Sequence, residues 1–212
     1  MFFHFRNTTN AFPMQGNQPS PTTLEDQQAL IDALQTYKTA HYKELLETQA
    51  QTRPGVLRVM DEALDDPTIA VGVCSASTKE AALKTLDITL GSNRVNRLDV
   101  CILGDDVSAK KPDPLIYNVA REKIGGLPAE KCVVIEDSLI GLQAAKGAGM
   151  KCVITYTSST TSQDFYGAGA DAKVPDLESR QVTLASIFGP LREHGSNADL
   201  LAGIKDPVEI SV

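Results

Sequence analysis

The sequence predicts an α/β protein whose mostly parallel sheet is covered by helices on both faces. From residue 56 onward, short apolar runs rich in β-branched residues alternate with segments of helical periodicity, which is the pattern of consecutive βαβ units. The composition, with 42% hydrophobic and 22% charged residues, is that of a globular chain. A length of 212 residues suits one core domain with a small appendage.

Residues 1–52 precede this alternation and are predicted to form a separate, largely helical part. Residues 1–23 are irregular, whereas Thr23 is a suitable N-cap for a helix with acids in its first turn. The apolar spacing after Thr23 is compatible with one long helix or with two short ones. The sequence RPG at Arg53–Gly55 interrupts the helical pattern and marks the predicted domain boundary.

The core is predicted over residues 53–194, and a loosely ordered tail is predicted over residues 195–212. Helices and strands are expected to alternate along the core, and Pro112 is expected in the first turn of its third helix. The expected strands are 69–75, 99–103, 132–136, 151–155 and 170–174. The expected helices are 56–65, 78–90, 114–124, 139–148 and 181–192.

Charge and composition argue against several classes of protein. The net charge of −7 and the lack of a Lys/Arg cluster argue against a nucleic-acid partner, although local positive charge still permits an anionic substrate. The four cysteines form no CxxC pair, so no zinc site is expected, and buried free thiols indicate a reducing compartment. No apolar stretch is long enough to span a membrane. As a separate expectation, we expect the protein to be a monomer. The N-terminal sequence is not typical of a signal or transit peptide, so we expect a cytosolic protein or a true N-terminus upstream of this chain.

Three of the predicted strands are followed, at their carboxyl ends, by polar side chains. Ser75–Ala76–Ser77–Thr78 stands at the end of the first strand, a loop with Lys111 follows the second, and Glu136–Asp137–Ser138 stands at the end of the third. Ligands of open parallel sheets bind at the carboxyl ends of the strands. We therefore expect the hydroxyls, the lysine and the two carboxylates to converge on one edge of the sheet.

The hydroxyls and the lysine of this set suit a phosphate group. Ser75 and Ser77 can offer hydroxyl and backbone N–H groups to phosphate oxygens, and helix capping by Ser77 or Thr78 is the alternative. Lys111 can neutralise a transferring phosphoryl group, and a solvated surface lysine is the alternative. Lys110 is equally basic, so we expect one of the two lysines to point outward.

Glu136 and Asp137 stand directly beyond a buried strand, where unpaired charges are costly. Two such acids near a lysine suit Mg²⁺, which prefers one or two carboxylates together with water and phosphate oxygens. The alternative is that Asp137 caps the following helix. A second acidic pair, Asp105–Asp106, is expected to be solvated or capping. Small residues in the helix after Asp137 are expected to let it lie close to the sheet, with Gly149 as its C′ residue.

As a set, these segments resemble the motifs of the haloacid dehalogenase-like (HAD-like) hydrolases, and most closely those of the CbbY-like sugar-phosphate phosphatases and the β-phosphoglucomutases. The sequence VCSAS is similar to the second motif, in which Ser75–Ala76–Ser77 would bind phosphate. The sequence KKPDPLIY is similar to the third motif, in which Lys111 would orient the phosphate. The sequence VIEDSLIGLQAAKGAGM is similar to the fourth, in which Asp137 would bind Mg²⁺ and Glu136 would support it through water.

The resemblance implies a Rossmann-like HAD core and the remnant of an α-helical cap domain. The sequence KTAHYKELLETQAQTRPGV resembles the end of that cap domain and its return to the core. It implies a Mg²⁺-dependent phosphatase of a sugar phosphate, of the xylulose 1,5-bisphosphate type, that works through an aspartyl-phosphate. It also implies a plastid setting as an alternative to the cytoplasm. A non-catalytic relative that binds phosphate and metal is the alternative function. A phospho-receiver domain is set aside, because its acidic pair comes first along the chain and its lysine last.

One motif of the family has no counterpart in this chain. The nucleophile of the family belongs to an Asp-x-Asp-Gly sequence at the end of the first core strand, and no two aspartates here are separated by one residue. In the family that strand lies between the strands of the second and fourth motifs, so we expect it to be missing and the sheet to have a gap. The chain as given is then expected to be inactive as a fragment or incomplete gene model, or to be a degenerate relative that binds without catalysis. A third explanation is that the N-terminal FFHF inserts as a replacement strand.

Overall fold

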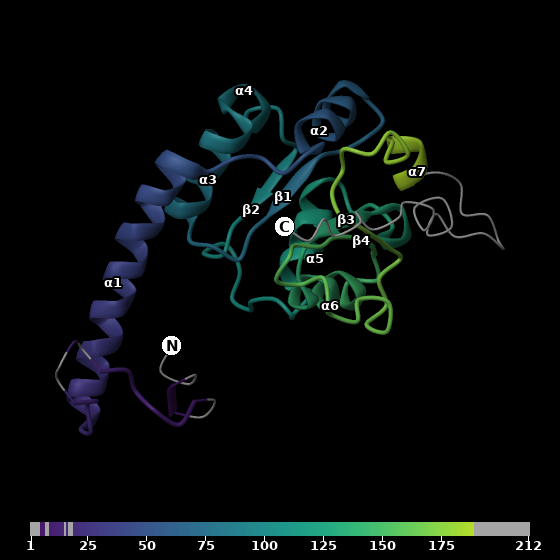
Figure 1. The fold of residues 1–212 in the computed structure, drawn as a ribbon. Helices are drawn as coiled ribbons and strands as arrows, with labels where there is room; N and C mark the ends of the chain where they lie inside the picture. Colours follow the sequence, from purple (N-terminus) through teal and green to yellow (C-terminus); the bar gives the residue numbers. More distant parts are fainter. Residues whose placement is uncertain (1–4, 7–8, 15, 17–18, 189–212) are drawn as a thin grey trace, which may run out of the picture. The chain divides into compact units, whose positions relative to one another are not determined.

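The structure is a computed structural model, and it describes residues 5–6, 9–14, 16 and 19–188. The chain divides into two compact units, Met1–Ala50 and Gln51–Val212. The first unit contains one long helix, and the second contains the strands and the other helices (Figure 1).

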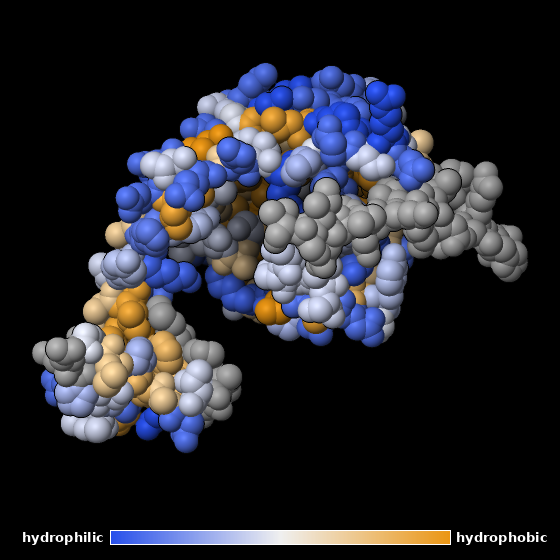
Figure 2. Space-filling model, viewed as in Figure 1, coloured by the Kyte–Doolittle hydropathy of each residue, from blue (hydrophilic) through white to orange (hydrophobic). Residues whose placement is uncertain are grey.

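The first unit is built around one long helix, α1 (Leu24–Gln49). Of the two alternatives left open by the sequence, the single helix is the one observed. The predicted N-cap is confirmed, because the Thr23 hydroxyl accepts a hydrogen bond of 3.1 Å from the backbone N–H of Asp26. Figure 2 shows apolar side chains gathered on this unit. The apolar cluster between the preceding segment and the start of the helix consists of Phe5, Phe12, Leu30, Ile31 and Leu34.

The second unit alternates helices and strands, which confirms the predicted α/β class. Its helices are α2 (Val56–Asp65), α3 (Lys79–Leu90), α4 (Ser92–Val95), α5 (Leu115–Lys123), α6 (Leu139–Gly147) and α7 (Leu184–Phe188), with a 3₁₀ turn, η2, at Ala129–Lys131. Its strands are β1 (Gly72–Cys74), β2 (Val100–Ile102), β3 (Val133–Glu136), β4 (Lys151–Thr155) and β5 (Ala172–Val174).

The strands of the second unit form two parallel sheets. β1 pairs with β2, and β3, β4 and β5 pair in that order. Cys74 lies opposite Ile102 and Glu136 lies opposite Ile154, so the carboxyl ends of the paired strands are aligned within each sheet. Within the residues that the structure describes, no ladder joins β1 to β3. The break lies between the two strands where the family resemblance implies a gap.

Helices cover both faces of these sheets, as predicted. On one face, α5 lies against β1 and β2, and α6 lies against β3 and β4 (Figure 1). Cys152 and Ile154 of β4 belong to the core on this face, whereas Val153 points to the other face and packs with residues of α2 and α7. On β3, Val133 packs with that second cluster, but Ile135 on the same face is 41% exposed beside the break.

Several boundaries differ from those expected. The strands β1, β2 and β5 are shorter than predicted, because each is paired along one edge only and over three residues. Pro112 is not in the first turn of α5, so that expectation is wrong. The helix begins at Leu115, whose N–H is bound by the Asp113 carboxylate at 2.9 Å, with Pro114 as the N-cap residue.

The short elements α4 and η2 were not predicted, since neither is long enough to show a periodic pattern. The predicted end of the last helix at residue 192 and the predicted tail at 195–212 lie outside the described residues. Within the described ranges, every helix is too short or too polar to cross a bilayer.

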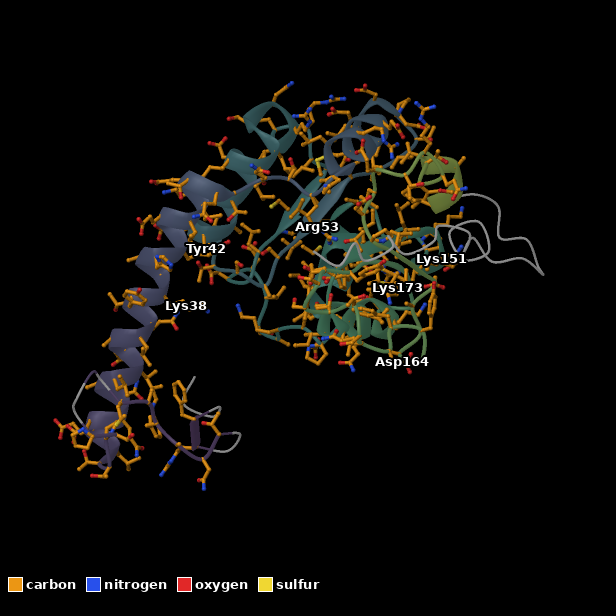
Figure 3. The ribbon with its side chains drawn as sticks, viewed as in Figure 1. Lys38, Tyr42, Arg53, Lys151, Asp164 and Lys173 are labelled. Atoms are coloured by element: carbon orange, nitrogen blue, oxygen red, sulfur yellow. The ribbon has the colours of Figure 1, made fainter. Side chains whose placement is uncertain are left out.

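Arg53, which is labelled in Figure 3, links the start of the second unit to the ends of β4 and β5. Its guanidinium donates to the Thr155 carbonyl at 2.5 Å and hydroxyl at 2.7 Å, and to the carbonyls of Tyr156 at 2.6 Å and Pro175 at 2.7 Å. Gly55 follows at a φ of 77°, where a Cβ would collide with the backbone of Leu177. The RPG sequence is therefore an anchor of the core, while the assignment of residues 1–52 to a cap domain stays a prediction.

Candidate functional site

Lys111 connects the carboxyl ends of β1 and β3. Its ammonium group donates to the carbonyl of Cys74, the last residue of β1, at 3.1 Å, and to Oε1 of Glu136, the last residue of β3, at 2.6 Å. The side chains of Lys111 and Glu136 are only 11% and 10% exposed. The predicted convergence of the three segments is therefore observed. The alternative of a solvated surface lysine is wrong for Lys111.

The Glu136 carboxylate accepts hydrogen bonds on both of its oxygens. Oε1 accepts from Lys111 at 2.6 Å and from the Tyr117 hydroxyl at 2.7 Å. Oε2 accepts from the Ser138 hydroxyl at 3.1 Å and from the backbone N–H of Asp137 at 3.2 Å. Burial by itself would raise the pKa of Glu136, but the charge of Lys111 and these hydrogen bonds outweigh it and hold the pKa below its ordinary value. Glu136 is thus an anion fixed in place.

Ser138, and not Asp137, caps helix α6. The Ser138 hydroxyl accepts a hydrogen bond of 3.1 Å from the N–H of Gly141 while it donates to Glu136. The alternative that Asp137 is the N-cap is therefore wrong, because the chain places Asp137 one residue too early. Asp137 is exposed at the end of β3, and helix capping does not occupy its carboxylate.

The start of α6 lies against the carboxylate of Glu136. A Cβ at Gly141 would collide with that carboxylate, and Ala145 in the next turn is fully buried. This confirms that small residues let the helix lie close to the sheet. The predicted C′ residue is also confirmed, because Gly149 has a φ of 73° and the N–H of Met150 donates to the Ala145 carbonyl at 3.0 Å.

At the end of β1, the next helix is capped from a neighbouring loop. Thr78 is the N-cap residue of α3, but its side chain makes no capping hydrogen bond. The Asp105 carboxylate accepts instead from the backbone N–H of Lys79 at 2.7 Å. The Ser75 hydroxyl accepts from the N–H of Ser77 at 3.2 Å and so closes a compact turn. Of the capping alternative, Thr78 therefore has the predicted N-cap position but not the capping hydrogen bond, and Ala76 and Ser77 lie exposed before it.

Lys110 and Asp106 hold the loop that follows β2. Lys110 is exposed and donates to the carbonyl of Gly104 at 2.8 Å, which confirms that one of the two lysines lies outward. Asp106 accepts a hydrogen bond of 2.8 Å from the N–H of Leu103. Together with the capping by Asp105, this confirms the expectation that the second acidic pair is solvated or capping.

Sequence reasoning missed Tyr117 and the capping role of Ser138 in this arrangement. Tyr117 is a buried polar aromatic residue on the sheet-facing side of α5, and its hydroxyl needs a partner there. Ser138 stands directly before an apolar helical run, which is the usual signal of an N-cap. Both signals were present in the sequence. A small residue was expected at position 141, but the requirement for glycine in particular depends on where the Glu136 side chain lies.

The oxygen donors at the end of β3 fit Mg²⁺. The described residues contain no group of three or more His, Cys, Asp or Glu that could enclose a metal ion. Mg²⁺ does not require such a group, since it binds through one or two carboxylates and keeps water and phosphate oxygens as its other ligands. Asp137 offers an exposed carboxylate of this kind, whereas Glu136 is already bound by its four donors. The geometry suits Asp137 for direct binding and Glu136 for support.

The sequence matches known proteins over most of its length. A family model described as haloacid dehalogenase-like hydrolase matches residues 11–149. A haloacid dehalogenase-like hydrolase domain-containing protein of Arabidopsis thaliana is 44% identical over 185 residues, which cover 84% of this chain and 58% of that protein. A CBBY-like protein of the same plant is 40% identical over 154 residues, covering 72% of this chain and 47% of that protein. The chain thus spans about half the length of the curated relatives it matches.

Solved structures share the fold. CbbY from Rhodobacter sphaeroides in complex with phosphate superposes with a TM-score of 0.65 at 30% identity, covering 80% of this chain and 71% of that one. A mutant of the same protein in complex with xylulose-(1,5)bisphosphate superposes with a TM-score of 0.64 at 28% identity, over the same shares of 80% and 71%.

Proposed function

Because the chain belongs to the haloacid dehalogenase-like hydrolases, we propose that its second unit is the phosphate- and metal-binding part of a Mg²⁺-dependent phosphatase that acts on a sugar phosphate. One observation carries the proposal: the Lys111 ammonium lies 3.1 Å from the Cys74 carbonyl and 2.6 Å from Glu136, between strands of two separate sheets. A cation held there, next to Ser75, can bind phosphate oxygens and stabilise the charge of a transferring phosphoryl group.

Each predicted site residue has a role in this proposal. The Ser75 hydroxyl and the Ala76 backbone N–H bind phosphoryl oxygens, and Ser77 completes the turn that positions them. Asp137 holds Mg²⁺, and Glu136 orients Lys111 and supports the ion through water. When bound, the ion neutralises the charge of the phosphate oxygens and helps to orient them.

The proposed substrate class comes from the relatives. The CbbY protein of Rhodobacter sphaeroides binds phosphate and, as a mutant, xylulose-(1,5)bisphosphate. We extend that class, a sugar phosphate of the xylulose 1,5-bisphosphate type, to the whole protein to which these residues belong. A plastid is the compartment we propose, with the cytoplasm as the alternative, because the two relatives named above are plant proteins.

The nucleophile is the part of the reaction that these 212 residues do not supply. They contain no Asp-x-Asp sequence, and Asp105, Asp106 and Glu136 are engaged in the hydrogen bonds described above. We propose that a strand bearing the nucleophile fits between β1 and β3, where the ladder is broken. The 212-residue chain alone then binds phosphate without hydrolysing phosphate esters. The lack of an Asp-x-Asp sequence favours a second candidate function, that of a relative that binds phosphate and metal without catalysis.

Calorimetric titration of inorganic phosphate into the 212-residue chain tests the proposal. We expect binding that depends on Mg²⁺ and that Lys111→Ala weakens by at least about tenfold, because the variant removes a charge-assisted hydrogen-bond donor. Lys151→Ala is the matched control. Lys151 lies at the start of β4, and the site lies at the other end of this sheet, where Ile154 pairs with Glu136 (Figure 3). The control removes the same charge and should change the affinity by less than about twofold.

Two further measurements separate the alternatives. An assay with p-nitrophenyl phosphate and Mg²⁺ should detect no turnover by the chain alone, and turnover that Lys111→Ala abolishes would contradict the lack of a nucleophile. Fusing the first-strand segment of a CbbY-like relative ahead of Met1 should restore turnover in a phosphatase and not in a binding relative. A chain that melts cooperatively but gives no Mg²⁺-dependent heat with phosphate contradicts the binding role itself.

A further inference from the structure

We infer that Tyr117 is a positioning residue of this site and holds the Lys111–Glu136 pair where a phosphoryl group is bound. The inference deepens the proposed function and rests on it for the identity of the ligand. Its geometry belongs to the chain alone, so the two can be tested apart.

Tyr117 contacts both members of the pair. Its hydroxyl donates to Oε1 of Glu136 at 2.7 Å, and Lys111 donates to that same oxygen at 2.6 Å. The ring of Tyr117 also lies under the ammonium group, with Nζ 4.7 Å from the ring centroid. The tyrosine is 5% exposed, so these contacts are largely shielded from water. Both kinds of contact are stronger in such a shielded place than in water.

The two donors on one oxygen fix the direction of the lysine. Oε1 offers two lone pairs, and Tyr117 takes one and leaves the other for Lys111. The remaining oxygen of Glu136 is held by Ser138, so the carboxylate cannot rotate to follow the ammonium. Lys111 is thus placed by three groups, the carboxylate, the Cys74 carbonyl and the ring. Burial raises the pKa of Tyr117, and the nearby Glu136 raises it further, so the phenol stays protonated and able to donate.

The break between the sheets gives this contact a role beyond local stability. Tyr117 lies on α5, which packs against β1 and β2, whereas Glu136 ends β3 of the other sheet. Because no ladder joins β1 to β3 within the described residues, side chains that cross the break set the spacing of the strand ends. Lys111 and Tyr117 both cross it. The positions of Ser75 and Asp137 relative to each other therefore depend on this tyrosine.

Tyr117→Phe tests the inference, because it keeps the ring and removes the hydrogen-bond donor. In the full 212-residue chain without ligand, we expect the order parameter of the Lys111 ammonium ¹⁵N, measured by NMR and assigned by its loss in Lys111→Ala, to fall from a rigid to a flexible value. We expect the affinity for inorganic phosphate with Mg²⁺ to fall about tenfold. Tyr166→Phe changes an exposed tyrosine of the same unit and should alter neither quantity.

A double-mutant cycle tests the route through the carboxylate. In a Glu136→Gln background, Tyr117→Phe should change the affinity for phosphate by less than about twofold, because the acceptor on which the hydroxyl acts has lost its charge. An equal loss of affinity in both backgrounds overturns the route through Glu136.

The readouts separate this inference from the proposed function. An unchanged order of the Lys111 ammonium in Tyr117→Phe overturns the inference, even if the melting temperature falls, because the tyrosine is then only structural. If Tyr117→Phe lowers the order parameter of the Lys111 ammonium but the wild-type chain binds no phosphate, the positioning role is supported and the proposed function is overturned. A looser ammonium with weaker phosphate binding supports both.

Discussion

The ends of β1 and β3 both lead through hydroxyl residues into a helix, but they are held in different ways. At the end of β3, the turn is locked from within, since Ser138 caps α6 and also donates to Glu136. At the end of β1, the capping group comes from outside, because the Asp105 carboxylate of the loop after β2 binds the first N–H of α3. The Ser75 hydroxyl is left to close its own turn with the N–H of Ser77.

The difference shows that the end of a strand can either fix a charged side chain in place or keep its hydroxyl groups available for a ligand. The internally locked turn at β3 fixes one carboxylate, Glu136, and leaves the next, Asp137, exposed. The externally capped turn at β1 keeps its hydroxyls out of helix capping. Lys111 joins the two turns across the break, so the proposed phosphate site depends on a side-chain link rather than on a continuous ladder.

The largest effect is expected from removing that link. Lys111→Met should lower the free energy of unfolding by about 3 kcal/mol, measured by urea denaturation, because it leaves the Glu136 charge almost buried and unpaired. Adding Glu136→Gln to this variant should recover part of the loss, since the unpaired charge is then gone. A double variant less stable than Lys111→Met would show that the pair does not cross the break as described.

The internally locked turn can be broken from the helix side. Gly141→Ala should lower the free energy of unfolding by about 1–3 kcal/mol, because its Cβ would occupy the position of the Glu136 carboxylate. Gly147→Ala in the same helix is the control. Its Cβ would meet Pro114 no closer than 3.4 Å, so the change should stay within about 1 kcal/mol and favour the helix. Equal losses from both variants would contradict the close approach of α6 to β3.

The two kinds of capping can be compared directly. Ser138→Ala and Asp105→Ala should each lower the free energy of unfolding by about 1 kcal/mol, because each removes the side chain that binds the first N–H groups of a helix. Thr78→Ala should change it by less than about 0.5 kcal/mol, since Thr78 is the N-cap of α3 by position but makes no capping hydrogen bond. A loss from Thr78→Ala as large as that from Asp105→Ala would show that α3 is capped from within, as α6 is.

The sequence predicted where the strands lie along the chain and that their ends converge, because both follow from local patterns. Apolar runs identify the strands, and parallel strands bring Ser75, Lys111 and Glu136 to one edge. The capping alternatives left open by the sequence depended on details of the two turns: Ser138 and not Asp137 caps α6, and Thr78 holds the N-cap position of α3 without a capping hydrogen bond. A helix shifted by one residue moves the capping hydrogen bond from an aspartate to a serine, which composition alone cannot resolve.

Contacts between distant segments were beyond prediction from the sequence. Asp105 caps a helix that starts 26 residues earlier, and Tyr117 donates to a carboxylate 19 residues later. Neither pairing leaves a local periodic signal, because each depends on how α5 and the loop after β2 pack on the sheets. The break between β1 and β3, in contrast, was predicted from the absence of one motif rather than from any residue present.

The smallest effect is expected at the thiols nearest the two turns, where pH changes the rate of reaction of the cysteines. Burial raises the pKa of Cys74, at the end of β1, to about 11, with the Lys111 charge opposing it, and raises that of Cys152, on β4 beside β3, to about 12. The thiolate is the reactive form, so a raised pKa leaves little of it at pH 8. In the native protein, labelling of both cysteines by a disulfide reagent should be slow at pH 8 and accelerate as the pH rises toward 11. Cys101 and Cys132, which are partly buried as Cys74 is, serve as controls and should react sooner, because burial raises their pKa by less. Labelling of Cys74 at the rate of the denatured chain would contradict its raised pKa.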